Sequence, residues 1–277
     1  MNHTEGRFQT PKGANIYYQH WQPEDDPRAI LFIVHGLAEH SGRYLNVVNH
    51  FVPRGYAVYG LDHIGHGKSD GTRVCLERFS DFTEPLKAYF DMIQGWHPGK
   101  PVFLVGHSMG GLIGSVYLLE HQDELKGAVL SAPAVKVSDT ISPVTITIGK
   151  LLSGILPKAG LMALDANAIS KDKAVVSAYI NDPLVYTGKV TARLAAEMLS
   201  AMKRVTAEAN TIRLPILLLQ GSADRLVDPG GAKMLHEKAS ATDKTLKVYD
   251  GLFHEIFNEP EHEQVLKDVE AWLETHL

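Results

Sequence analysis

The chain has 277 residues, of which 44% are hydrophobic and 21% charged, and its formal net charge is −5. This composition is typical of a globular protein and gives no electrostatic reason to expect nucleic-acid binding. The single cysteine, Cys75, cannot form an internal disulfide, so nothing points to an oxidising compartment. The first residues are polar and lack the apolar core of a secretory signal, and we therefore expect a cytoplasmic protein.

Apolar runs and helical stripes alternate along the first half of the chain. The continuous apolar run at 29–34 is typical of a strand covered on both faces, and apolar residues at 44–52 recur at the spacing of one helix face. Predicted strands span 14–21, 29–34, 56–61, 102–105 and 128–131, and predicted helices span 44–52, 82–93 and 111–117. This order predicts an α/β fold with a mostly parallel central sheet flanked by helices.

The alternation stops at residue 134 and resumes at about residue 210. Residues 134–209 carry helical signals but no convincing strand, and we interpret them as an inserted helical cap on a core formed by residues 1–133 and 210–277. The core continues with predicted strands at 215–219 and 245–249 and predicted helices at 231–239 and 265–273.

The most apolar long segment of this cap spans residues 141–164. Pro143, Lys150, Pro157 and Lys158 interrupt it, so it does not suit a membrane-spanning helix. Such a segment can lie on a lipid surface instead. We therefore expect transient contact with lipid through the cap, which would make the protein peripheral at a membrane.

Five residues, Gly106-His107-Ser108-Met109-Gly110, lie between an apolar strand and a helix of small residues. A sharp strand-turn-helix of this kind is a nucleophile elbow, which exposes its serine on a strained turn. Glycine two residues before and two residues after the serine avoids collisions with the neighbouring helix and strand. The pattern predicts that Ser108 is a nucleophile, and it excludes an aspartate nucleophile at this position.

A serine hydroxyl needs a base within hydrogen-bonding reach, and the base needs an anionic partner. In folds with this elbow, the acid and then the histidine follow the serine along the chain. Asp224 comes just after a predicted strand, with Asp228 as the alternative acid, and His254 follows the strand at 245–249. Because parallel-sheet sites form at the carboxyl ends of strands, we predict that Asp224 and His254 are the partners of Ser108.

The oxyanion that forms when a serine attacks a carbonyl needs preorganised donors. One is the backbone N–H of the residue after the nucleophile, which is Met109, and the other comes from a loop after an early strand. His35-Gly36-Leu37 follows the strand at 29–34. We predict that the N–H groups of Leu37 and Met109 form an oxyanion hole.

Two other patterns do not define a binding site. The Gly-His-Gly-Lys-Ser segment at 65–69 is similar to the end of a phosphate loop, but Asp62 stands where such a loop needs its first glycine. His63 and His66 have no further ligands at convincing spacing. We therefore expect no metal and no cofactor.

Four motifs together resemble the monoacylglycerol lipase and lysophospholipase branch of the α/β-hydrolases over nearly the whole chain. Residues 35–44 match the HG-x-x-EH-x-x-RY loop of that family, 62–71 its D-x-x-GHG-x-S-x-G segment, 106–111 its GHSMGG elbow and 220–224 its QGSAD loop. The resemblance implies the α/β-hydrolase fold, with about eight strands and a helical cap. It also implies hydrolysis of glycerol monoesters of fatty acids without a cofactor.

In that family, the residues that match Glu39, Arg43, His107 and Tyr179 form a polar end that receives glycerol. The alternative is that Glu39 and Arg43, four residues apart, form a surface ion pair. Apolar cap residues would either cover the acyl chain or pack the cap onto the core; they are Ile146, Ile148, Leu151, Leu152, Ile155, Leu156 and Leu161.

We therefore expect a serine hydrolase that is acylated on Ser108 and expels an alcohol with His254 as general acid. Water activated by the same histidine would then release the fatty acid. The expected partner is a monoacylglycerol or a related lipid ester. Two alternatives stay open: a carboxylesterase or lysophospholipase on the same scaffold, and a receptor that keeps this fold to bind a small apolar ligand.

Overall fold

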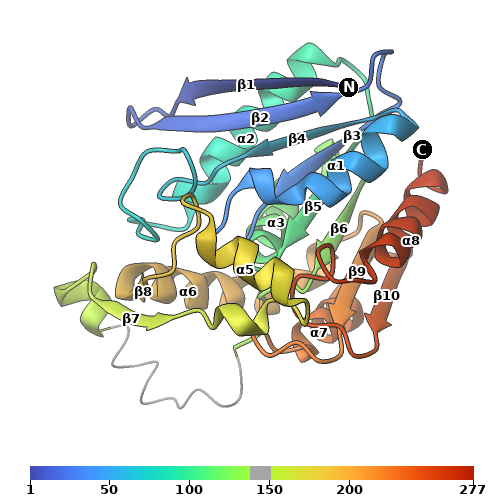
Figure 1. The fold of residues 1–277 in the computed structure, drawn as a ribbon. Helices are drawn as coiled ribbons and strands as arrows, with labels where there is room; N and C mark the ends of the chain where they lie inside the picture. Colours follow the sequence, from blue (N-terminus) through green and yellow to red (C-terminus); the bar gives the residue numbers. More distant parts are fainter. Residues whose placement is uncertain (138–150) are drawn as a thin grey trace.

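The computed structural model describes residues 1–137 and 151–277 and has an eight-stranded sheet at its centre (Figure 1). The strands are β1 (Asn2–Gln9), β2 (Asn15–Gln22), β3 (Ala29–Val34), β4 (Tyr56–Leu61), β5 (Val102–His107), β6 (Gly127–Ser131), β9 (Ile216–Gly221) and β10 (Lys244–Tyr249). Across the sheet they follow the order β1-β2-β4-β3-β5-β6-β9-β10. Pairing is antiparallel from β1 to β4 and parallel from β4 to β10, which confirms the mostly parallel sheet.

Strand β3 illustrates how the sheet is covered on both faces. Ile30 and Phe32 belong to one hydrophobic cluster, whereas Leu31 and Ile33 belong to another, because successive side chains of a strand point to opposite faces. The first cluster packs against α2 (Ser80–Trp96), α3 (Met109–His121) and α7 (Gly230–Lys238). The second packs against α1 (Leu45–Phe51) and α8 (His262–Glu274). Figure 1 shows these two groups of helices on opposite sides of the sheet.

The described chain between β6 and β9 holds both helices and strands. Residues 151–155 are helical, followed by β7 (Gly160–Ala163), α5 (Lys173–Asn181), β8 (Lys189–Thr191) and α6 (Ala192–Glu208). β7 and β8 form a small antiparallel sheet, so the prediction that this segment lacks strands is wrong. All four residues of β7 are exposed, and a short exposed strand shows no alternation of apolar and polar residues. Strand β1 was not predicted either, because it is polar and largely exposed and shows no such alternation.

This segment contacts the core at several places, of which two position it over the site. Helix α6 packs against α3, and its Ala201 and Val205 belong to the same hydrophobic cluster as the core helices. The chain after α5 lies against the loop that follows β3. There the N–H of Tyr186 donates to the Ala38 carbonyl at 2.8 Å. These contacts place residues 151–209 over the carboxyl ends of the central strands.

Candidate active site

Ser108 lies between β5 and α3 in a strained backbone conformation. Its φ of 55° and ψ of −118° are rarely adopted by residues other than glycine. A Cβ atom at Gly106 would come 2.6 Å from the Gly110 carbonyl oxygen, and one at Gly110 would come 1.9 Å from the Val34 carbonyl oxygen. The turn therefore requires both glycines, in agreement with a nucleophile elbow.

The His254 ring is hydrogen-bonded to Asp224, and both side chains are buried. The ring Nδ1 lies 2.8 Å from Oδ2 of the aspartate. Oδ1 accepts the N–H groups of Leu226 at 2.8 Å and Val227 at 3.2 Å, and Oδ2 also accepts the Gln220 amide at 3.0 Å. Burial alone would raise the pKa of Asp224, but the His254 ring and the backbone donors outweigh it and lower the pKa. The aspartate thus stays ionised beside the ring.

The same carboxylate acts on the histidine in return. Burial lowers the pKa of His254, but Asp224, and to a smaller extent Glu255 and Glu39, more than offset this effect and raise the pKa. Because Nδ1 faces Asp224, Nε2 is the ring nitrogen left to exchange a proton with a hydroxyl group.

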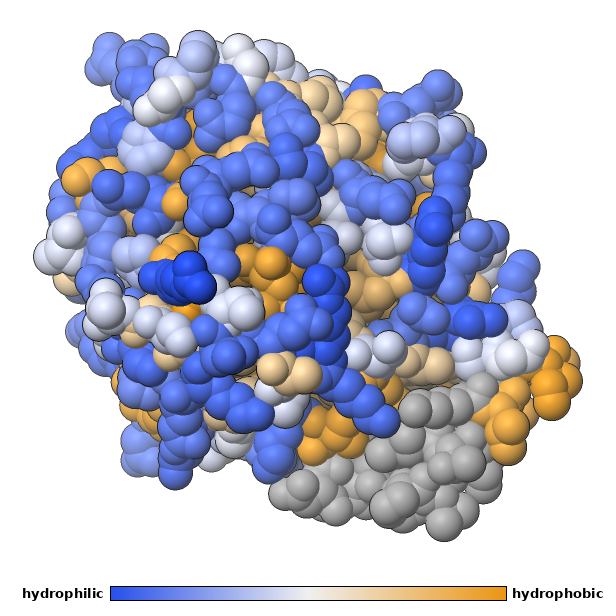
Figure 2. All heavy atoms as spheres, turned by 180° about the vertical axis from the view of Figure 1, so that it is seen from behind, coloured by the Kyte–Doolittle hydropathy of each residue, from blue (hydrophilic) through white to orange (hydrophobic). Residues whose placement is uncertain are grey.

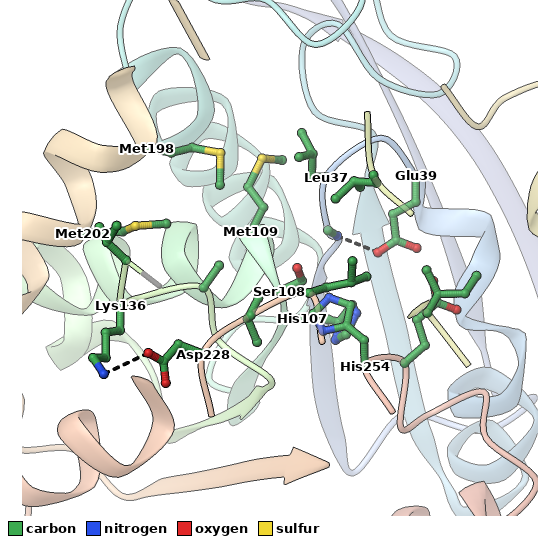
Figure 3. A pocket seen from close by; sticks show the side chains of 18 of the residues that line it. Leu37, Glu39, His107, Ser108, Met109, Lys136, Met198, Met202, Asp228 and His254 are labelled. Atoms are coloured by element: carbon green, nitrogen blue, oxygen red, sulfur yellow. Dashed lines mark hydrogen bonds and ion pairs between the residues drawn. The ribbon is translucent and has the colours of Figure 1, made fainter. Parts of the chain in front are cut away.

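The alternative acid, Asp228, has different partners. Its Oδ2 lies 2.8 Å from Nζ of Lys136, and its Oδ1 accepts the N–H of Gly230 at 2.8 Å. Asp228 and Lys136 do line the cavity that contains Ser108 (Figure 3). The carboxylate that accepts a hydrogen bond from the His254 ring is nevertheless that of Asp224, so the geometry favours Asp224 as the acid.

The loop after β3 is shaped by the Glu39 carboxylate. Its Oε1 accepts the Gly36 N–H at 2.6 Å, marked in Figure 3, and the Tyr44 hydroxyl at 2.9 Å. Leu37 and Met109, which we predict to stabilise an oxyanion, both line the cavity. Met109 is the first residue of α3, where backbone N–H groups have no acceptor within the helix.

Two of the residues predicted to bind glycerol, Glu39 and Arg43, belong to a buried cluster of ion pairs. Arg43 donates to Glu39 at 3.1 Å and, through two nitrogens, to Glu255 at 2.6 and 2.7 Å. The ion pair between Glu39 and Arg43 that we gave as the alternative therefore exists, but with side chains only 5% and 10% exposed it is buried and does not lie at the surface. The Tyr179 ring covers the guanidinium, with its centroid 4.7 Å from Cζ. Sequence reasoning missed Glu255, whose only signal was its position next to His254.

The cavity has a polar end on one side of Ser108 and a largely apolar end on the other, where the Lys136–Asp228 ion pair also forms part of the wall (Figure 3). Figure 3 shows Glu39 and His107 to one side of the serine and Met198 and Met202, from α6, to the other. Burial and the adjacent His254 ring lower the pKa of His107 to about 4, so this residue is neutral at neutral pH. The remaining apolar lining comes from Ala134, Val137, Leu164, Ile169, Leu199, Leu226 and Val227.

The apolar cap residues that we expected either to cover an acyl chain or to pack the cap onto the core lie largely elsewhere. Ile146 and Ile148 fall outside the described residues. Leu151, Ile155 and Leu156 are 63%, 76% and 57% exposed and are not part of the cavity lining, so for them the prediction is wrong. An apolar pattern alone cannot tell an inward-facing helix surface from an outward-facing one. Within the described ranges, no helix combines the length and the apolar character needed to cross a membrane.

The segment at 62–72 forms turns and bends. Asp62 accepts the N–H groups of Ser41 at 2.9 Å and Lys68 at 2.8 Å, which ties this segment to the neighbouring loop. In residues 1–137 and 151–277, His, Cys, Asp and Glu side chains form no group of three or more suited to a metal ion.

The doubly covered sheet and the serine elbow together define an α/β-hydrolase. A family model described as serine aminopeptidase, S33, matches residues 25–261, and the chain belongs to this family.

Three lipases are similar to this chain over nearly their full length. The chain is 40% identical to the monoacylglycerol lipase of Mycolicibacterium smegmatis over 99% of its own length and 98% of that protein. It is 36% identical to the monoglyceride lipase of Mus musculus over 94% of its own length and 87% of that protein. The crystal structure of the Paleococcus ferrophilus monoacylglycerol lipase superposes with a TM-score of 0.84 at 32% identity and covers both chains completely.

Proposed function

We propose that this chain is a serine hydrolase that cleaves monoacylglycerols into a fatty acid and glycerol. The observation that carries the proposal is a cavity in which Ser108 and the His254–Asp224 pair stand between a polar end and an apolar end. An ester of a fatty acid with glycerol has the same two ends, with the scissile bond between them. The similar proteins from Mycolicibacterium smegmatis and Mus musculus are both named for this substrate class, which supports the assignment.

In the first half of the reaction, His254 takes the hydroxyl proton of Ser108 as the serine oxygen attacks the ester carbonyl carbon. The N–H groups of Leu37 and Met109 stabilise the oxyanion. When the tetrahedral intermediate collapses, His254 gives the proton to the departing glycerol oxygen, and the acyl group stays on Ser108. Asp224 stabilises the histidine cation while it exists.

In the second half, His254 takes a proton from water as the water attacks the acyl-serine carbonyl. The second tetrahedral intermediate collapses with release of the fatty acid, and the proton returns to Ser108. This sequence consumes one water molecule for each ester bond and leaves the protein unchanged.

Glycerol would bind at the polar end beside Glu39, His107 and Tyr179, and the acyl chain would lie along Met198 and Met202. A triacylglycerol carries apolar chains on all three oxygens and would leave the buried polar groups of this end without partners, which is costly. The geometry therefore favours a monoester over a triester.

Residues 134–209 act, in this proposal, as a cap on the core formed by residues 1–133 and 210–277. The cap also carries exposed apolar side chains at Leu151, Ile155, Leu156 and Met162. Figure 2 shows orange side chains gathered beside the grey atoms at one margin of the molecule. An exposed apolar patch of this kind suits contact with the lipid surface in which the substrate resides.

The test is the release of fatty acid from mono-, di- and triacylglycerols, a lysophospholipid and a short soluble ester under one condition. We expect monoacylglycerol to give a kcat/KM at least about tenfold above that of triacylglycerol. A higher kcat/KM for the lysophospholipid or the soluble ester would mean that this ester is the preferred substrate, while the serine hydrolase mechanism would still hold. Failure to hydrolyse any of these esters would overturn the proposal.

A further inference from the structure

We infer that Arg43 is a positioning residue that holds the oxyanion loop and the His254 loop in one arrangement, and that it does not bind substrate. The inference rests on the proposed function only in assuming that Ser108 and His254 perform ester hydrolysis. Within the described part of the chain, the cavity is lined by Glu39, Tyr179 and Glu255 but not by Arg43. The guanidinium lies behind these residues and contacts all three.

The first contact fixes the loop that carries the general base. Two guanidinium nitrogens donate to the two carboxylate oxygens of Glu255, at 2.6 and 2.7 Å. A bidentate pair of this kind sets the orientation of both side chains as well as their distance. Glu255 follows His254 directly, and its own N–H donates to the Ile169 carbonyl at 2.7 Å. Glu255, the residue after His254, is therefore held through both its side chain and its backbone N–H.

The second contact fixes the loop that carries an oxyanion donor. Arg43 donates to Oε2 of Glu39 at 3.1 Å, and Oε1 of the same carboxylate accepts the Gly36 N–H at 2.6 Å. Gly36 immediately precedes Leu37, whose N–H is the proposed donor. Ala38, next along this loop, has a φ of 66°, a strained value that persists only where surrounding contacts enforce it. One carboxylate thus connects Arg43 to the backbone beside the donor.

The third contact explains why a guanidinium is needed. The ring of Tyr179, from α5, stacks on the face of the Arg43 guanidinium. The Arg43 side chain is only 10% exposed, so the charges of the cluster are shielded from water. A planar guanidinium can pair with two carboxylates in its plane while an aromatic ring covers its face, whereas a lysine ammonium cannot match this geometry. Arg43→Lys therefore keeps the charge but loses the bridge between the two loops.

The decisive experiment measures kcat and KM of Arg43→Lys on two esters of the same fatty acid, a monoacylglycerol and a nitrophenyl ester without glycerol. We expect kcat to fall by about tenfold or more on both esters by the same factor, with KM changed by less than about twofold, because misplaced groups slow the chemical step. A loss confined to the monoacylglycerol, with a raised KM, would show that Arg43 binds glycerol and overturn the inference. Unchanged kcat on both esters would overturn it as well.

The matched control is Arg28→Lys. Arg28 also pairs with a glutamate, Glu274, at 2.8 Å and faces a tyrosine ring, Tyr56, at 5.5 Å, but it is not part of the cavity wall. Its kcat on both esters should stay within about twofold of the wild type. Thermal unfolding of both variants establishes that they are folded. If Arg43→Lys does not fold, Glu255→Gln, which keeps the size but not the charge, is measured in the same way.

A second readout separates positioning from a general loss of structure. Because Glu39 and Arg43 act on Gly36 through one chain of contacts, the effects of Glu39→Gln and Arg43→Lys on kcat should not add. The double variant should be no slower than the slower single variant on the nitrophenyl ester. Additive losses would contradict the inference. Since this ester contains no glycerol, the result does not depend on whether monoacylglycerol is the true substrate.

Discussion

Nδ1 of His254 lies 2.8 Å from Oδ2 of Asp224, and both side chains are buried at the carboxyl edge of the sheet. Asp228, only four residues further along the chain, pairs instead with Lys136. Asp224→Asn should therefore lower kcat on a soluble ester by about a thousandfold or more, because it removes the charge that stabilises the histidine cation. Asp228→Asn is the matched control and should lower kcat by less than about tenfold. The reverse order of effects would mean that Asp228 is the acid.

A second prediction concerns Gly110, where a Cβ would lie 1.9 Å from the Val34 carbonyl oxygen. Gly110→Ala should destabilise the fold by about 3 kcal/mol or more, since a backbone atom cannot move aside cheaply. Gly95→Ala is the control, because Gly95 is exposed in α2 and a Cβ there has no neighbour within 4 Å. It should stabilise the protein by up to about 1 kcal/mol. Urea unfolding measures both, and a Gly110→Ala variant as stable as the wild type would contradict the elbow geometry.

Much of the fold, and the gathering of Ser108 and the His254–Asp224 pair at one cavity, could be predicted because the signals are local. The apolar run of β3, the two glycines around Ser108 and the position of His254 after a strand are each visible within a few residues. The alternation of strands and helices then predicts that these segments meet at one edge of the sheet.

The polar cluster could not be predicted in the same way. Arg43 and Glu255 stand 212 positions apart, and no local pattern indicates that a carboxylate next to a histidine will be buried against a distant guanidinium. The exposure of Leu151 and Ile155 could not be predicted either. Periodicity gives the spacing of residues on a helix face but does not show what that face contacts. Both features depend on tertiary packing.

Buried histidines next to the oxyanion loop predict a loss of stability in acid. Burial lowers the pKa of His66 to about 3, that of His35 to about 4, and that of His63 well below its ordinary value. In the unfolded chain each pKa returns to about 6.5, so the unfolded state binds more protons below that pH. The free energy of unfolding should therefore fall as the pH decreases from about 6.5 towards 4.

Urea unfolding at pH 7.5 and pH 5 checks this prediction with a single substitution. Among the described residues, neither ring nitrogen of His63 has a hydrogen-bond partner, so His63→Leu removes a titrating group without breaking a hydrogen bond of its ring. The substitution should reduce the loss of stability between pH 7.5 and pH 5, because the unfolded wild type binds a proton at this position that the folded protein does not. An unaltered loss in His63→Leu would refute the assignment.

The proposed lipid-facing surface predicts vesicle binding through apolar contact. Leu151→Ser combined with Ile155→Ser should abolish co-sedimentation with lipid vesicles, because these side chains are 63% and 76% exposed. With a net charge of −5, the wild type should bind equally at low and high salt. Val248→Ser, at a 56% exposed position on the edge strand β10, is the control and should bind like the wild type. Binding that disappears with salt would point to a charged surface instead.

Catalytic turnover of monoacylglycerol by Ser108 is tested by a time course of fatty-acid release with substrate in large excess over protein. We expect linear release far beyond one fatty acid per protein chain in the wild type, and a rate at least about a thousandfold lower in Ser108→Ala. Release that stops at one equivalent, with the product retained, would indicate a receptor built on a hydrolase fold. Undiminished release by Ser108→Ala would contradict the mechanism altogether.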